Sequence, residues 1–104
     1  YKDLEIVLVN DGSNDQSLKI LENYALRDTR IKVVNQENKG VAAARNTGLD
    51  NATGDYILYV DSDDWIENNM VERMVELSAN ADIVFCGNDN AVSPESVKKR
   101  EDYL

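Results

Sequence analysis

The sequence predicts an α/β domain in which helices cover both faces of a mostly parallel sheet. Short apolar segments alternate with amphipathic helical segments along the 104 residues. The apolar segments lack a polar–apolar alternation, which is typical of parallel strands buried on both faces. Turn and helix-capping residues separate the segments. A chain of this length is expected to supply one domain at most.

The first predicted strand covers residues 4–9, with the sequence LEIVLV. The polar stretch 10–13 ends it. Ser13 and Gln16 have the spacing of a capping box, in which each side chain bonds a backbone N–H of the other residue. A helix is therefore expected from about Asn14 to Arg27, with leucines and alanine on its apolar face.

Two further strands and a helix follow. Residues 31–34 (IKVV) predict the second strand, and residues 35–40 form a polar loop. Residues 41–49 are rich in alanine and predict a short helix. After a break at 52–55, residues 56–60 (YILYV) predict the third strand.

The last third of the chain repeats this pattern. Asp64 and Glu67 form a second capping-box pair, which predicts a helix extending to about residue 79. Residues 82–86 (DIVFC) predict a fourth strand, and Ser93 followed by Pro94 predicts the start of a last helix. The order is β-α-β-α-β-α-β-α, which favours a parallel sheet.

Composition excludes several functions. Twenty acidic residues against eleven Lys and Arg give a formal charge of −9, which argues against nucleic acid or anionic lipid as the main ligand. The absence of histidine excludes Ser-His-Asp and Cys-His catalysis. The single cysteine, Cys86, cannot form an internal disulfide or a zinc cluster. No long apolar run or secretion leader is visible, so a soluble cytoplasmic setting is expected.

Acidic residues follow two of the predicted strands. Asp11 follows the first strand, and Asp61, Asp63 and Asp64 follow the third. The carboxyl ends of parallel strands meet at one edge of a sheet, so these groups are expected to lie together. Two unit charges about 4 Å apart repel by about 4 kcal/mol at an effective dielectric near 20. A proton, a helix N-terminus or a cation must compensate, and oxygen ligands without His or Cys favour Mg²⁺ or Mn²⁺.

Each candidate residue also has a purely structural interpretation. Capping a helix is the simplest role for Asp64, and Asp11 could belong to a turn. Arg45 is either a solvated cation or a residue that faces the acidic edge and holds an anionic ligand. Trp65 could stack on a ligand ring, but anchoring in the core is the preferred interpretation. Asp61 and Asp63 favour a cation or phosphate site, because one cap already suffices for the helix.

Three stretches together resemble family 2 glycosyltransferases of the GT-A fold. They are residues 4–13 (LEIVLVNDGS), 38–48 (NKGVAAARNTG) and 54–65 (GDYILYVDSDDW), in the family's order and spacing. The resemblance extends from residue 1 to about residue 87. It is to the nucleotide-binding half of the enzyme, whose fold is Rossmann-like.

The resemblance implies a role for four residues. Asp11 resembles the aspartate that contacts the nucleotide base, and Arg45 the arginine lining the base and diphosphate pocket. Asp61 and Asp63 resemble the DxD motif, whose first aspartate approaches the ribose and the cation and whose second ligates the cation. The implied reaction is transfer of a sugar from a nucleotide-sugar donor, a UDP-sugar, to a glycan or lipid-linked acceptor. Mn²⁺ or Mg²⁺ assists departure of the diphosphate, and the anomeric centre is inverted.

Two departures from the family pattern shape these expectations. The family has a strand and a helix before the position of Tyr1, and its general base and most of its acceptor site come after the position of Leu104. The chain therefore resembles a partial domain covering residues 1–104, inactive by itself, with its catalytic base elsewhere. The absent strand would lie between the strands at 4–9 and 56–60, so self-association through open sheet edges is expected. The parent enzyme is expected in the cytoplasm or at the inner face of the membrane.

Two other functions stay open at this point. A Mg²⁺-dependent phosphotransfer domain, such as a haloacid-dehalogenase-like phosphatase or a receiver domain, also places aspartates at strand ends. It needs a lysine after a later strand, and none follows residues 82–86 until Lys98. The third possibility is a non-enzymatic half-domain that only associates with itself.

Overall fold

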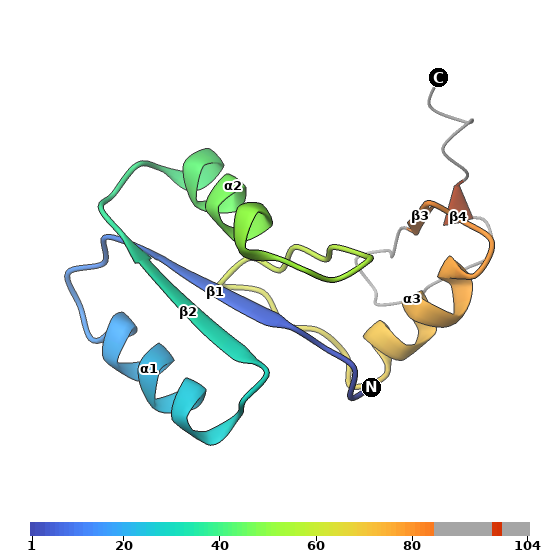
Figure 1. The fold of residues 1–104 in the computed structure, drawn as a ribbon, viewed down its shortest axis with the longest axis horizontal. Helices are drawn as coiled ribbons and strands as arrows, with labels where there is room; N and C mark the ends of the chain where they lie inside the picture. Colours follow the sequence, from blue (N-terminus) through green and yellow to red (C-terminus); the bar gives the residue numbers. More distant parts are fainter. Residues whose placement is uncertain (85–96, 99–104) are drawn as a thin grey trace. The chain divides into compact units, whose positions relative to one another are not determined.

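The computed structural model describes residues 1–84 and 97–98, which form two compact units. One unit is Lys2–Tyr59, and the other is Tyr1 together with Val60–Leu104. The elements in chain order are β1 (Ile6–Asp11), α1 (Ser17–Arg27), β2 (Ile31–Gln36), α2 (Val41–Asn51), α3 (Met70–Ser78), β3 (Ile83–Val84) and β4 (Val97–Lys98) (Figure 1).

The unit Lys2–Tyr59 is built on the parallel pair β1–β2. The pairing runs residue for residue from Ile6 opposite Ile31 to Asp11 opposite Gln36. Both strands begin with branched apolar residues, which suit an extended, half-buried backbone. Helix α1 connects the two strands, and α1 and α2 lie on opposite sides of the pair (Figure 1). The predicted α/β class, with parallel strands and helices on both faces, is confirmed.

Helix α2 packs closely against β1. A β-carbon built on Gly48 would lie 3.6 Å from a methyl carbon of Val9, which is ordinary van der Waals contact. Side chains alternate between the two faces of a strand, so Val9 and Asp11 share the face that α2 covers. The carboxylate of Asp11 therefore lies on the α2 side of the sheet.

The predicted cap of α1 is wrong. The helix begins at Ser17, three residues later than expected, and Gln16 occupies the cap position without a side-chain capping bond among the described residues. Asp15 takes this role instead, because its Oδ1 accepts the backbone N–H of Ser17 at 2.9 Å. The Asp15 carboxylate thus accepts a backbone N–H at the helix start that has no partner within the helix. The predicted Ser13–Gln16 capping box would have served the same kind of donor.

An ion pair closes the turn between α1 and β2. The Asp28 carboxylate accepts hydrogen bonds from Nε and Nη2 of Arg30 at 3.0 and 2.8 Å, and from the Arg30 backbone N–H at 3.0 Å. These bonds from Arg30 lower the pKa of Asp28 from 3.8 to about 2. The guanidinium also donates to the backbone carbonyl of Lys2 at 3.3 Å, which ties the start of the chain to this turn.

The predicted third strand at residues 56–60 is wrong. The described part of the chain has no strand there, and its large apolar side chains are 41–57% exposed, from Leu58 at the low end to Tyr56 at the high end. A strand exists only where a neighbouring backbone supplies hydrogen bonds. The described partner of β1 is β2, and no described strand extends that sheet further. An apolar, β-branched sequence was therefore insufficient to produce a strand here.

The second unit contains α3, which starts five residues later than expected. Asp64 does not cap it. The Asp64 backbone N–H donates to the Asp61 carbonyl at 3.0 Å in a separate turn. The helix begins at Met70, whose side chain is only 5% exposed, and the Met70 N–H donates to the Glu67 carbonyl. Burial of the apolar face, rather than the spacing of capping residues, determines where this helix starts.

A short antiparallel pair follows α3. Ile83 lies opposite Lys98, and Val84 lies opposite Val97. The predicted fourth strand is thus confirmed at residues 83–84, but its partner runs antiparallel instead of parallel. Cys86 and the predicted helix start at Ser93 lie outside the described residues, and residues 97–98 form a strand instead of a helix. Among the helices of the described part, none is long and apolar enough to cross a membrane.

Candidate functional site

The Asp11 carboxylate at the end of β1 holds the loop between β2 and α2. Its Oδ1 accepts hydrogen bonds from the Gln36 side-chain amide at 2.7 Å and from the Lys39 backbone N–H at 2.9 Å. Its Oδ2 accepts the Gly40 backbone N–H at 2.9 Å. One carboxylate therefore gathers three donors from the segment that follows β2.

Gly12 makes this close approach possible. Its φ angle is +72°, in the left-handed region that residues with a β-carbon rarely adopt. A β-carbon at this position would lie 2.6 Å from the backbone nitrogen of Asn38, well inside van der Waals contact. The Asp11–Gly12 pair thus combines a carboxylate that binds the loop with a backbone that allows the loop to come near.

The hydrogen bonds keep Asp11 ionised. The Gln36 amide lowers the pKa of Asp11 most, followed by the Lys39 backbone N–H. The Gly40 N–H and the Lys39 charge lower the pKa further, whereas partial desolvation raises it. An ionised carboxylate offers about four acceptor positions on its two oxygens. Among the described residues, two donors meet Oδ1 and one meets Oδ2, so Oδ2 has capacity for one more donor.

Gln36 also connects Asp11 to helix α2. The Thr47 hydroxyl donates to Oε1 of Gln36 at 2.6 Å, while Nε2 of the same amide donates to Asp11. Neither residue was predicted as a site residue from the sequence. Gln36 could have been found from the strand register, because it is the residue directly opposite Asp11. Thr47 lies two residues after Arg45 in the 38–48 stretch, but its orientation depends on how α2 packs.

A second polar pair lies on the other face of the same strands. Asn10 is 4% exposed, and its Nδ2 donates to Oδ1 of Asn35, its register partner, at 2.8 Å. Because side chains alternate, this amide pair lies on the face opposite Asp11 and Gln36. The carboxyl ends of β1 and β2 are therefore polar on both faces, as expected where a parallel sheet binds ligands.

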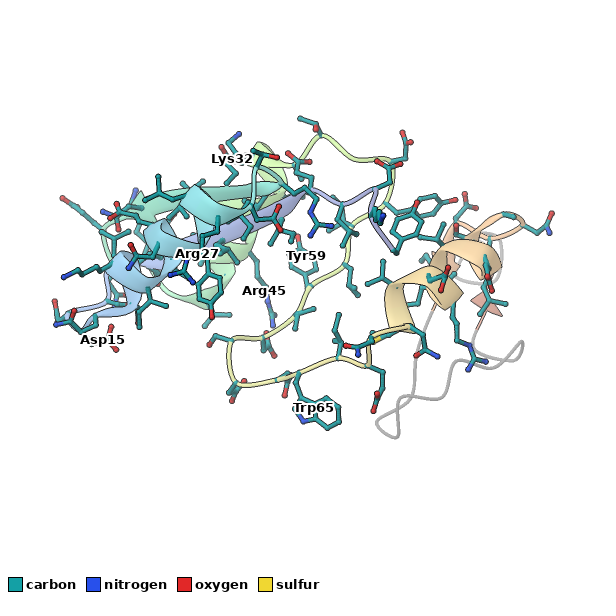
Figure 2. All side chains as sticks on the ribbon, turned by 90° about the horizontal axis from the view of Figure 1, so that it is seen from below. Asp15, Arg27, Lys32, Arg45, Tyr59 and Trp65 are labelled. Carbon is teal, nitrogen blue, oxygen red and sulfur yellow. The ribbon has the colours of Figure 1, made fainter. Side chains whose placement is uncertain are left out.

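Arg45 lies on α2 with an exposed side chain (Figure 2). Successive helical residues are about 100° apart, so Arg45 and Thr47 lie about 200° apart around the helix axis. Thr47 faces Gln36. The structure therefore places Arg45 in the same unit as Asp11 but on a different side of α2 from the contact with Gln36.

Asp61 and Asp63 lie in an exposed turn of the second unit. Trp65 follows them, 72% exposed, with its indole projecting away from the loop (Figure 2), so the expectation that it anchors the core is wrong. Within the described part of the chain, no group of three or more His, Cys, Asp or Glu side chains gathers as a metal site. Two aspartates fit Mg²⁺ or Mn²⁺, since such ions take one or two carboxylates and complete their coordination with substrate phosphates and water.

The structure brings only some of the predicted site residues together. Asp11 joins the start of α2 through the loop, and Arg45 lies on that helix. Asp61 and Asp63 belong to the other unit. The juxtaposition of Asp11 with these two aspartates stays a prediction.

Comparison with known proteins identifies the type of domain. The family model described as glycosyl transferase family 2 matches residues 1–103. The chain is 54% identical over 74 residues to the glycosyltransferase GlyA of Streptococcus pneumoniae, covering 71% of this chain and 11% of that protein. It is 48% identical over 84 residues to the putative glycosyltransferase EpsH of Bacillus subtilis, covering 80% of this chain and 24% of that one.

A third relative matches along the whole chain. An uncharacterized glycosyltransferase of Haemophilus influenzae is 37% identical over 113 residues, covering 100% of this chain and 45% of its own length. The chain thus spans less than half the length of each of these three relatives. The resemblance predicted from the three sequence stretches is confirmed.

Proposed function

The chain belongs to glycosyl transferase family 2, and we propose that it supplies the nucleotide-sugar-binding part of an enzyme that uses a UDP-sugar. The enzyme transfers the sugar to a glycan or lipid-linked acceptor with inversion at the anomeric carbon. The family match over residues 1–103 favours this function over the phosphotransfer alternative.

The observation that carries the proposal is the held, ionised carboxylate of Asp11. Three donors fix it at the carboxyl end of β1, and Oδ2 can accept one more hydrogen bond. Uracil offers a matching N–H between two carbonyl groups. Cytosine carries an unprotonated nitrogen at the equivalent ring position, which would repel a carboxylate. A carboxylate at this place therefore favours uracil over cytosine.

The remaining site residues act on the diphosphate. Asp61 approaches the ribose and the cation, Asp63 ligates the cation, and Arg45 lines the base and diphosphate pocket. The acidic residues and the diphosphate are all anionic, so Asp61 and Asp63 would hold a divalent cation that offsets their repulsion. When bound, Mn²⁺ or Mg²⁺ neutralises charge on the departing diphosphate.

The reaction needs groups beyond these residues. A general base outside residues 1–104 removes the proton of the acceptor hydroxyl as that hydroxyl attacks the sugar. The reaction takes place in the cytoplasm or at the inner face of the membrane. Association of copies through open sheet edges stays a prediction.

Calorimetric titration of the full-length protein with UDP and with CDP, each in the presence of Mn²⁺, tests the base assignment. We expect UDP to bind at least about 10-fold more tightly than CDP, which corresponds to one charge-assisted hydrogen bond. Asp11→Asn should reduce this preference, because the amide no longer offers two anionic acceptors. Equal affinity of the unmodified protein for the two nucleotides would contradict the proposal.

A further inference from the structure

We propose that Gln36 and Thr47 are positioning residues that orient the Asp11 carboxylate toward the nucleotide base. This inference rests on the proposed function of Asp11. It concerns the direction in which the carboxylate presents its second oxygen, and neither residue needs to touch the ligand.

The hydrogen bonds from Thr47 to Gln36 and from Gln36 to Asp11 have a fixed direction. An ionised carboxylate can only accept, so Gln36 must turn its Nε2 toward Asp11, and the two atoms lie 2.7 Å apart. Its Oε1 then faces the other way and accepts the Thr47 hydroxyl at 2.6 Å. Each group has a single orientation that satisfies its neighbour. The bonds therefore run in one direction, from α2 through β2 to β1.

The two oxygens of the Asp11 carboxylate receive different numbers of hydrogen bonds from the described donors. Gln36 and the Lys39 N–H both occupy Oδ1, whereas Oδ2 receives only the Gly40 N–H among the described donors. The amide thus makes the two oxygens unequal and leaves capacity on Oδ2. Without it, the Lys39 and Gly40 N–H groups would hold one oxygen each, and the two oxygens would offer equal remaining capacity. Fixing a group before the ligand arrives raises affinity by reducing the entropy lost on binding.

Thr47 lies on α2, the helix that also carries Arg45. The Thr47–Gln36 bond attaches α2 to the strand pair at the level of Asp11, because Gln36 is the register partner of Asp11. Asp11 on β1 and Arg45 on α2, both assigned to the nucleotide, are therefore held in fixed positions relative to each other. Loss of the hydroxyl would loosen this connection without removing either residue.

The test compares four variants of the full-length protein. Thr47→Val removes the hydroxyl at nearly constant volume, and Thr47→Ser restores it. Gln36→Leu removes the amide. Thr53→Val is the matched control, because the Thr53 hydroxyl bonds Glu5 before the start of β1 and has no bond to Asp11. The readouts are calorimetric affinity for UDP with Mn²⁺ and the pKa of the Asp11 carboxyl by NMR.

We expect Thr47→Val and Gln36→Leu to weaken UDP binding by about 10-fold, as expected for loss of a bond that orders a charged group. Binding of CDP should change much less. Thr47→Ser should recover affinity to within about threefold, and Thr53→Val should bind UDP as the unmodified protein does. The pKa of Asp11 should rise in Gln36→Leu, because the bond that lowers it most is lost.

Unchanged UDP affinity in Thr47→Val, together with an unchanged Asp11 pKa in Gln36→Leu, would overturn the proposal. Equal weakening in Thr47→Val and Thr53→Val would also overturn it, because it would indicate general destabilisation. If the unmodified protein does not bind UDP, the proposed function fails. The Asp11 pKa in Gln36→Leu then still decides whether the amide orients the carboxylate.

Discussion

Gly12 and Asn38 approach so closely that a β-carbon on Gly12 would lie 2.6 Å from the Asn38 backbone nitrogen. This contact joins the end of β1 to the loop that Asp11 holds. The neighbour is backbone, which cannot move aside as the end of a flexible side chain could. The position therefore combines a positive φ angle with steric exclusion.

Gly12→Ala should lower the free energy of unfolding by about 3 kcal/mol, through left-handed strain and overpacking together. Urea denaturation measures this. Gly40→Ala is the matched control, because φ is +90° there but a β-carbon would meet no described atom within 4 Å. Strain alone should cost about 1 kcal/mol. An equal decrease in the free energy of unfolding in the two variants would show that crowding against Asn38 does not contribute to the destabilisation.

The Asp28–Arg30 pair predicts how stability depends on pH. The folded-state pKa of Asp28 is lowered from 3.8 to about 2, so its contribution is present above pH 3.8. This stabilising contribution is lost as the pH falls from 3.8 toward about 2, where the Asp28 carboxylate of the folded protein also takes up a proton. Urea unfolding of Asp28→Asn over this interval should show a weaker pH dependence than the unmodified protein. An identical slope in both proteins would contradict the assignment.

Substitutions of Asp63 and Asp64 should differ in their effect on UDP binding. Asp63→Ala should abolish Mn²⁺-dependent UDP binding by the full-length protein, because it removes a proposed cation ligand. Asp64→Ala, one residue along the same exposed loop, should retain it. Calorimetry with and without Mn²⁺ measures both. Retention of metal-dependent binding by Asp63→Ala would refute the metal assignment.

The same Asp64→Ala variant tests whether Asp64 caps α3. The structure places Asp64 in a turn before the helix, so its loss should change the free energy of unfolding by less than about 0.5 kcal/mol. A true helix cap would cost about 1 kcal/mol. Thermal or urea unfolding distinguishes these values.

The sequence predicted those features that depend on local pattern. The apolar runs at 4–9 and 31–34 became β1 and β2, and the helical segments between and after them became α1 and α2. Capping positions were wrong at both Ser13 and Asp64. Several side chains near a helix start can satisfy the same donors, so spacing alone does not select among them.

Features that depend on distant parts of the chain could not be predicted in this way. Residues 56–60 have the composition of a strand, but a strand also needs a partner backbone. Asp11 was recognisable as a polar residue after a strand. Its bonds to Gln36 and, through it, Thr47 depend on strand register and on the rotation of α2, which no short motif encodes.

The hydrogen bond from the buried Asn10 amide to the exposed Asn35 has a consequence for the alignment of the two strands. If β2 slid by one position, Asn10 would meet Val34, and a buried amide would lose its partner at a cost of about 1–3 kcal/mol. The pair thus penalises misalignment of the two strands. The same alignment places Gln36 opposite Asp11. Asn10 and Asn35, on the face away from α2, therefore help to form the hydrogen bonds among Asp11, Gln36 and Thr47 on the face that α2 covers.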